Sequence, residues 1–194
     1  MMLGQEEEFQ GPYNSPGQYL GRRVSLRHVR PGDGEFVAGL LSQSSTLAGL
    51  PPRADFTSAD HLDQRLGPML SQYLAERRAD RGIARGPIGW FAAIRPDLWS
   101  GTAQVVGALD AQLQRQGWAF EACLLFARAL RSEWALRKIY VEIPSYADER
   151  LKALLQQVGT LEACLSDSIS YDERRWDMLI YGIPLGSANL ETAQ

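Results

Sequence analysis

The chain has 194 residues, of which 45% are hydrophobic and 22% are charged, and its formal net charge is −3. This size suits one domain with a single hydrophobic core. The slightly acidic balance argues against a nucleic-acid-binding protein, which usually carries a basic excess. No apolar run approaches the roughly 20 residues that a membrane-spanning helix needs, so we expect no membrane partner.

The N-terminal segment MMLGQEEEFQGPYNSPGQ contains three consecutive glutamates and no apolar stretch. It lacks the features of a secretory signal, so we expect a cytoplasmic protein in which residues 1–19 form a mobile arm. Residues 20–185 are expected to form one domain, and residues 186–194 a C-terminal tail. No internal repeat or linker divides the chain.

The cysteines Cys123 and Cys164 lie in apolar runs, which predicts buried free thiols. Together with His28 and His61, the only histidines, they show no spacing typical of a zinc site. We therefore expect no metal. His28 falls on the apolar face of a predicted strand, where a hydrogen-bonded structural histidine is expected rather than a catalytic one.

The first half of the chain predicts one strand and two helices. RVSLRHVRPGDG alternates as a strand that ends at Pro31. Asp33 can cap a helix that buries Phe36, Val37, Leu40 and Leu41. After a loop at 44–57, helical spacing predicts a second helix that starts at Ser58 and is kinked by Pro68. Its apolar positions are Leu62, Leu66, Met69, Leu70, Tyr73 and Leu74.

In the second half of the chain, the spacing of the apolar residues changes from a helical pattern to a strand pattern. Strands are predicted at 87–94 and 101–110, followed by a helix over 118–133 whose buried stripe includes Ala122, Cys123 and Phe126. RKIYVEIP predicts a further strand. A helix over 148–158, ended by Gly159, and a hairpin around SYDER complete the chain. This order of elements predicts an α/β fold with a mixed sheet and helices on both faces.

The string QRQGWAFEA, from Gln114 to Ala122, connects a predicted strand to a predicted helix. A loop that turns into a helix N-terminus presents converging backbone N–H groups, which suits a diphosphate. Gly117 and Ala119 are small enough to let a phosphate approach the backbone. Gln114 can brace the loop, and Arg115 adds positive charge.

In this context the sequence resembles the GNAT superfamily of N-acetyltransferases, most closely its ribosomal-protein N-terminal acetyltransferase branch. The resemblance covers residues 23–183 and is sharpest over ALDAQLQRQGWAFEACLLFARALRSEWALRKIYVEIPSYADERLKALLQQVG. The acetyl-CoA signature of the family falls on Gln114, Gly117 and Ala119. The Glu-Ala that commonly follows in this branch falls on Glu121 and Ala122.

The resemblance implies a mostly antiparallel central sheet of about six to seven strands and an acyl-CoA co-substrate, with acetyl-CoA expected. The backbone of Leu109 and Ala111 would pair with the pantetheine arm, which lies where two strands splay apart. The pyrophosphate would lie on Gln114, Arg115, Gln116, Gly117, Trp118 and Ala119. It further implies an amine-bearing acceptor, a small molecule or a peptide N-terminus, which attacks the thioester directly, and a possible homodimer through the final hairpin.

Three positions depart from the family pattern. Asp148 stands where the family often has an asparagine beside the coenzyme, Thr160 replaces the phenylalanine of a Gly-Phe pair, and Leu155 replaces a tyrosine that would protonate the leaving thiolate. The strand before the loop offers Gln104 and Asp110 in place of the glutamate that often serves as the base.

The catalytic candidates are therefore Glu142 as general base and Tyr140 or Tyr146 as general acid. By strand alternation Glu142 shares a face with Tyr140, opposite Ile139, Val141 and Ile143. For each of these side chains an ordinary structural role is the alternative. Trp90, Trp99 and Trp118 are candidates for a substrate pocket, although core packing is the expected role of Trp90.

Two other functions stay open at this point. A non-catalytic acyl-CoA-binding module would keep the phosphate loop without the chemistry, and the leucine at 155 favours it. An acyltransferase that uses a longer acyl chain or a carrier-protein thioester is also compatible with the sequence. The identity of the acceptor is not encoded in any motif of the chain.

Overall fold

The computed structural model describes residues 17–42, 47–48, 69–78, 84–110 and 117–186. Its strands form one sheet in the order β1-β2-β4-β5-β6-β7-β9-β8, and β3 pairs with β6 beside that path. Only β6 and β7 pair in parallel. The strands are β1 (Gln18–Leu20), β2 (Val24–His28), β3 (Leu47–Ala48), β4 (Met69–Arg78), β5 (Ala84–Asp97), β6 (Thr102–Leu109), β7 (Lys138–Pro144), β8 (Thr160–Tyr171) and β9 (Arg174–Pro184).

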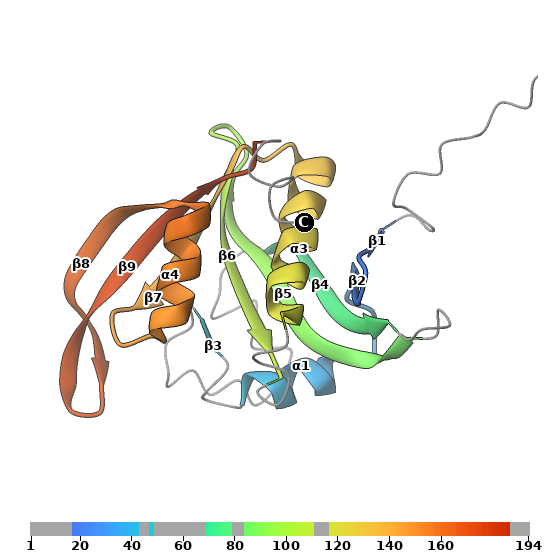
Figure 1. The fold of residues 1–194 in the computed structure, drawn as a ribbon, viewed down its shortest axis with the longest axis horizontal. Coiled ribbons are helices and arrows are strands. Elements are labelled where there is room, and N and C mark those ends of the chain that lie inside the picture. Colours follow the sequence, from blue (N-terminus) through green and yellow to red (C-terminus); the bar gives the residue numbers. More distant parts are fainter. Residues whose placement is uncertain (1–16, 43–46, 49–68, 79–83, 111–116, 187–194) are drawn as a thin grey trace, which may run out of the picture.

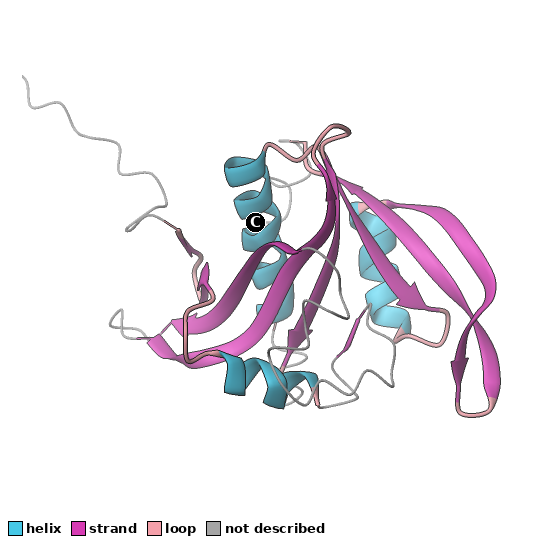
Figure 2. Ribbon diagram, turned by 180° about the vertical axis from the view of Figure 1, so that it is seen from behind, coloured by secondary structure: helices cyan, strands magenta, loops and turns pink. Residues whose placement is uncertain are grey.

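Within the described ranges, three helices pack on this sheet, α1 (Gly34–Leu41), α3 (Trp118–Trp134) and α4 (Glu149–Val158). Figures 1 and 2 show α3 and α4 on one face, to either side of β6, and α1 on the other face. The predicted α/β fold with a mixed, mostly antiparallel sheet is thus confirmed. The strand count exceeds the expected six to seven because β1, β3 and β4 are not evident from the sequence pattern.

The helix predicted to extend through Leu74 is wrong from Met69 onward, because these residues form strand β4. Tyr73 and Ala75 pack toward α3, whereas Leu74 packs toward α1. A strand that is covered on both faces carries consecutive apolar residues, and such a run resembles a helical stripe. The expected helical positions from Ser58 to Leu66 lie outside the described residues.

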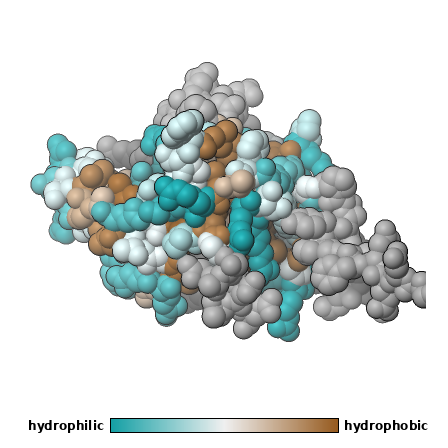
Figure 3. Space-filling model, turned by 90° about the horizontal axis from the view of Figure 1, so that it is seen from above, coloured by the Kyte–Doolittle hydropathy of each residue, from teal (hydrophilic) through white to brown (hydrophobic). Residues whose placement is uncertain are grey.

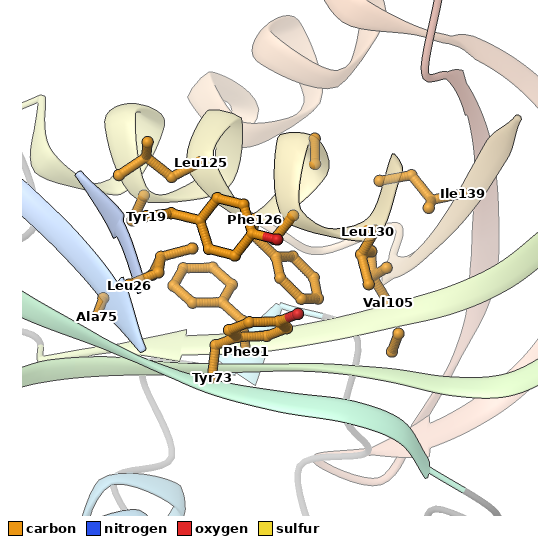
Figure 4. Close-up of a cluster of buried hydrophobic side chains, with 14 of the residues drawn as sticks. Tyr19, Leu26, Tyr73, Ala75, Phe91, Val105, Leu125, Phe126, Leu130 and Ile139 are labelled. Atoms are coloured by element: carbon orange, nitrogen blue, oxygen red, sulfur yellow. The ribbon is translucent and has the colours of Figure 1, made fainter. Parts of the chain in front are cut away.

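The core beneath α3 is built around four aromatic rings from four elements (Figure 4). Phe126 of α3 meets Phe91 at 5.5 Å and Tyr73 at 5.6 Å between ring centroids. Tyr19 of β1 adds an edge contact to Tyr73 at 6.2 Å. Rings of this size bury enough apolar surface to fix α3 firmly on the sheet.

Glu133, near the end of α3, satisfies the polar atoms at the edge of this core. The hydroxyls of Tyr19 and Tyr73 each donate to its carboxylate at 2.7 Å. Burial, followed by this hydrogen bond to a carboxylate, raises the pKa of Tyr73 above its ordinary value. His28 packs its ring on Tyr73 at 4.4 Å and lies 3.3 Å from Glu133, so its expected structural role is confirmed.

The residues that precede α4 and α1 make different hydrogen bonds. Asp148 caps α4, because its Oδ1 accepts from the backbone N–H of Arg150 at 2.8 Å, and the helix ends at Gly159 as predicted. Asp33 precedes α1 but makes no side-chain cap. Instead it accepts two bonds from Arg27, at 2.7 and 3.0 Å, so the predicted capping role of Asp33 is wrong.

Both cysteines are exposed, which corrects the expectation of buried thiols. In α3 the buried stripe passes through Trp118, Ala122 and Phe126. Cys123 falls just beside that stripe, because one helical position turns a side chain by about 100°. Cys164 lies on β8, an outer strand whose side chains are nearly all exposed.

Candidate functional site

The parallel strands β6 and β7 separate part-way along their length. Four residue pairs join them, from Thr102 with Lys138 to Val105 with Val141. Beyond Val105, β6 continues to Leu109 and β7 to Pro144 without further pairing between them. The strands therefore diverge after this last pair, as the resemblance implied, and Figure 1 shows the widening space between their ribbons.

The backbone of Leu109 faces the diverging edge of β6. The neighbouring Asp110 donates its N–H to the carbonyl of Ile88 on β5, at 2.9 Å. Because successive backbone groups of a strand point to opposite edges, the N–H and C=O of Leu109 point away from β5. They lie on the side from which β7 has departed. Gly107 has the same orientation and pairs there with Ala48 of β3. Ala111 lies outside the described residues.

Gly117 immediately precedes α3 and has φ = +74°, a left-handed conformation that glycine adopts without a Cβ penalty. Having no side chain, it cannot cap the first-turn N–H groups of the helix. Trp118 and Ala119 begin the helix here, so their N–H groups belong to its positive end. Gln114, Arg115 and Gln116 lie outside the described residues, which leaves their expected phosphate contacts as predictions.

Arg23 and Glu121 brace this helix start against the sheet. Glu121 Oε1 accepts the backbone N–H groups of Arg23 at 2.8 Å and Val24 at 3.3 Å, and its Oε2 accepts Arg23 Nε at 3.1 Å. Desolvation opposes ionisation of Glu121, but the bonds from Arg23 outweigh it and lower its pKa. The carboxylate nearest the expected phosphate position is thereby paired with a cation.

Glu142 is the first residue of β7 beyond the last pair with β6. Its neighbours Val141 and Ile143 pack toward α3 and α4. By alternation Glu142 and Tyr140 point to the opposite face, the one that carries α1. Glu142 is half-buried, and no residue in the described part of the chain forms a hydrogen bond or ion pair with its carboxylate. The predicted placement of Glu142 with Tyr140 is therefore confirmed.

The two tyrosine candidates have different surroundings. The ring of Tyr140 lies 5.4 Å from Lys138 Nζ. Tyr146 follows β7, and its ring stacks on Tyr171 at 4.9 Å and meets Trp176 edge-on at 5.2 Å. Burial, together with the nearby Tyr171, raises the pKa of Tyr146. The aromatic partners Tyr171 and Trp176 were not anticipated, because contacts across a hairpin leave no local motif.

Leu155 stands at the position where the resemblance leads us to expect a catalytic tyrosine, and here this position belongs to the core. Leu155 is buried and packs with Ile143 and Tyr181 beneath α4. An aliphatic side chain in that place cannot supply a proton. The acid must therefore come from another element if the chain is catalytic.

The three tryptophans are not gathered at one site. Trp90 is fully buried, and its Nε1 donates to Gln72 at 3.1 Å, so core packing is its role. Trp118 is buried at the start of α3. Trp99 is 99% exposed on the turn between β5 and β6.

Among the described residues, no three histidine, cysteine, aspartate or glutamate side chains are grouped in a way that could hold a metal ion. In the same part of the chain, no helix is both long and apolar enough to cross a membrane.

No family model matches the sequence, and no curated protein matches it either. Solved structures do match. A spermidine N-acetyltransferase from Vibrio cholerae, in complex with CoA and spermine, has a TM-score of 0.69 at 16% identity, over 84% of this chain and 96% of that one. A ribosomal-protein-S5-alanine acetyltransferase from Vibrio fischeri has a TM-score of 0.66 at 12% identity, over 88% and 97%. The chain thus has the fold of the GNAT acetyltransferases.

Proposed function

We propose that this chain is a GNAT N-acyltransferase that carries an acyl group, with acetyl the expected one, from coenzyme A to an amine. The observation that carries the proposal is the position of Glu142. A half-buried carboxylate without a described partner lies where β6 and β7 diverge, on a fold shared with acetyltransferases. A carboxylate that no described side chain engages is free to accept a proton from a bound amine, directly or through a water.

The coenzyme would lie along the diverging strands. Its pyrophosphate would accept from the first-turn N–H groups of α3, at Gly117, Trp118 and Ala119, with Gln114 to Gln116 completing the loop. Leu109 offers backbone groups to the pantetheine arm, and Ala111 would continue that row. Asp148 uses Oδ1 for its cap, and its Oδ2 can accept from an amide N–H of the arm.

Starting from an ammonium group, the acceptor nitrogen loses two protons and the leaving sulfur gains one. Glu142 would take the first proton from the acceptor ammonium, through a water, and the neutral amine would attack the thioester carbonyl. As the tetrahedral intermediate collapses and its C–S bond breaks, Tyr146 or Tyr140 would protonate the departing thiolate, and the second proton of the nitrogen would replace the one that the tyrosine gives up. Binding both substrates in one complex supplies several kcal/mol by positioning alone, so no covalent enzyme intermediate is required.

The acceptor we propose is an amine, either a small molecule or a peptide N-terminus. The two structural neighbours are named for a small amine, spermidine, and for an alanine of ribosomal protein S5. The half-buried position of Glu142 favours an acceptor that approaches from the face that carries α1, because the side chain points there.

The test is twofold. Mass spectrometry of the purified protein detects a co-purifying CoA species, and turnover is then measured with acetyl-CoA and a panel of amines. We expect turnover that Glu142→Gln reduces without weakening CoA binding. CoA binding without turnover of any amine would support the second candidate, an acyl-CoA-binding module, which the buried Leu155 favours. No binding of any CoA species would overturn both.

A further inference from the structure

A second arginine lies beside the start of α3 and has no role in the proposed chemistry. Arg77 follows the buried part of β4 and pairs with Val24, next to Arg23. Its guanidinium carbon lies 4.7 Å from the centroid of the Trp118 ring. Arg23 Nη2 lies 3.4 Å from the carbonyl of Gly117. Two guanidinium groups, one from β4 and one from the turn before β2, therefore flank the first turn of the helix.

The charges of these two arginines are balanced differently. Arg23 is paired with Glu121 at 3.1 Å. Arg77 has no carboxylate partner within the described ranges, and its guanidinium group lies over the Trp118 ring. The adjacent Glu76 points to the other face, where it binds Arg27 at 2.7 Å. A positive charge is thus held against an aromatic face and left uncompensated, in a chain whose net charge is −3.

We infer that Arg77, assisted by Arg23, binds the 3′-phosphate of the acyl-CoA nucleotide. The inference rests on the proposed function, which places the pyrophosphate on the backbone N–H groups of α3. The 3′-phosphate is the other anionic group of the coenzyme, and as a phosphomonoester it carries a charge of about −1.5 to −2 at pH 7. A guanidinium group can meet such a phosphate with two parallel hydrogen bonds.

The arrangement restricts the orientation of Arg77 before the ligand arrives. Stacking on Trp118 fixes the plane of the guanidinium group, so less side-chain entropy is lost on binding. The same ring is the first residue of α3, whose N–H belongs to the proposed pyrophosphate site. Trp118 therefore belongs to both proposed sites. Its backbone N–H would bind the pyrophosphate, and its ring holds the arginine that would bind the 3′-phosphate.

A consequence concerns the acyl donor. A thioester on a carrier protein contains phosphopantetheine but no adenosine nucleotide and no 3′-phosphate. A site built on Arg77 would favour free acyl-CoA over such a donor. This separates the two donor classes that the sequence leaves open.

The experiment compares acetyl-CoA with acetyl-3′-dephospho-CoA, which differ by one phosphate. Affinities are measured by calorimetry for the wild-type chain, Arg77→Gln, Arg77→Lys and Arg22→Gln. Arg22 is exposed on the turn before β2 and serves as the matched control for loss of one positive charge. For the wild type and Arg22→Gln we expect removal of the phosphate to weaken binding by about tenfold or more, the usual effect of losing a charged hydrogen bond.

For Arg77→Gln we expect the two ligands to bind within about threefold of each other, because the group that distinguishes them is gone. Arg77→Lys keeps the charge and should restore part of the difference. Equal binding of the two ligands by the wild type would overturn the inference and leave the proposed function standing. A tenfold preference retained in a folded Arg77→Gln protein would overturn it as well. Failure of the wild type to bind either ligand would remove the proposed function and this inference together.

Discussion

The carboxylate of Glu121 accepts the backbone N–H of Arg23 at 2.8 Å and its Nε at 3.1 Å, so one acid fixes the point where β2 meets α3. The two residues are 98 positions apart in sequence. A third donor, the N–H of Val24, completes the set at 3.3 Å. Because Gly117 lies one turn before Glu121, this brace also holds the residue on which the proposed phosphate site depends.

Glu121→Gln should destabilise the fold in a pH-dependent way. The pKa of Glu121 is lower in the folded chain than in the unfolded one. Its contribution to the free energy of unfolding is therefore complete above about pH 4.5 and is lost as the pH falls through the folded pKa. Urea melts at pH 7 and pH 3 should show a gap in the free energy of unfolding between wild type and variant that is smaller at pH 3. Glu35→Gln, at an exposed position in α1, is the control. A gap of equal size at both values would contradict the assignment.

Gly117→Asp should abolish coenzyme binding while the fold persists. The substitution places bulk and negative charge where the phosphate would lie, and a Cβ there would come within 3.1 Å of Arg23 Nη2. The left-handed backbone adds a stability cost of about 1 kcal/mol. Gly32→Asp is the matched control, because Gly32 also has positive φ, +98°, and no atom lies within 4 Å of an added Cβ. Calorimetry with acetyl-CoA gives the result, and unchanged affinity in folded Gly117→Asp would remove the phosphate site.

Glu142→Gln should lower kcat by about a hundredfold at pH 7, the usual range for loss of a general base, and leave the affinity for acetyl-CoA unchanged. The deficit should shrink as the pH rises, because the acceptor amine then loses its proton to solvent. A pH–rate profile of both proteins measures this. Superimposable profiles would assign Glu142 a structural role only.

The preference between acceptor amines follows from the free energy needed to remove a proton from each ammonium group. An unperturbed α-amino group titrates near pH ~8 and a lysine side chain near ~10.4, so neutral lysine costs about 3 kcal/mol more at pH 7. The strand before the phosphate loop offers no glutamate, which leaves Glu142 to offset that difference. We expect α-amines to react faster than lysine-like amines of matched structure. Steady-state rates measured on such pairs of amines test this preference. Faster turnover of the lysine side chains would contradict it.

We predict that the chain forms a homodimer through the outer strand β8. Among the described strands β8 lies at the edge of the sheet, with twelve residues, of which Leu161 and Leu165 are exposed by 45% and 49%. Figure 3 shows apolar surface at the end of the molecule where this hairpin projects. A second copy of the edge can satisfy its backbone groups across a two-fold axis. Light scattering should give twice the 21.6 kDa chain mass.

Leu165→Lys should shift that assembly to the monomer by placing a charge on the edge. Leu98→Lys, at an exposed leucine on the distant turn between β5 and β6, should leave the mass unchanged. A wild-type particle of 21.6 kDa would exclude pairing through β8.

Local sequence patterns predict much of the second half of the fold. The helix after Gly117, the strand through Glu142, the helix over 148–158 and the final hairpin are all confirmed. Each of these elements has one clear period and a definite end signal. Side chains of a strand alternate between two faces, and this alone was enough to predict that Glu142 lies opposite Ile143.

The errors have a common physical origin. β4 is covered on both faces, so its apolar run carries no period of two, and β1 and β3 are too short to show one. The brace between Arg23 and Glu121 and the stacking of Arg77 on Trp118 join distant parts of the chain. A single sequence holds no periodic signal for such pairs, because they depend on how the sheet and the helices come together.

The four residue pairs between β6 and β7 also divide the sheet into two mechanical units. On one side, β6 and the strands before it share the cores beneath α3 and α1. On the other side, β7 and β9 share a smaller core beneath α4, and Ile139 of β7 also reaches the core beneath α3. A coenzyme lying between the diverging strands would bind both units at once and act as a second attachment. Ligand binding should therefore slow amide hydrogen exchange in β9 as well as at the phosphate loop, and raise the cooperativity of unfolding, although β9 never touches the phosphates.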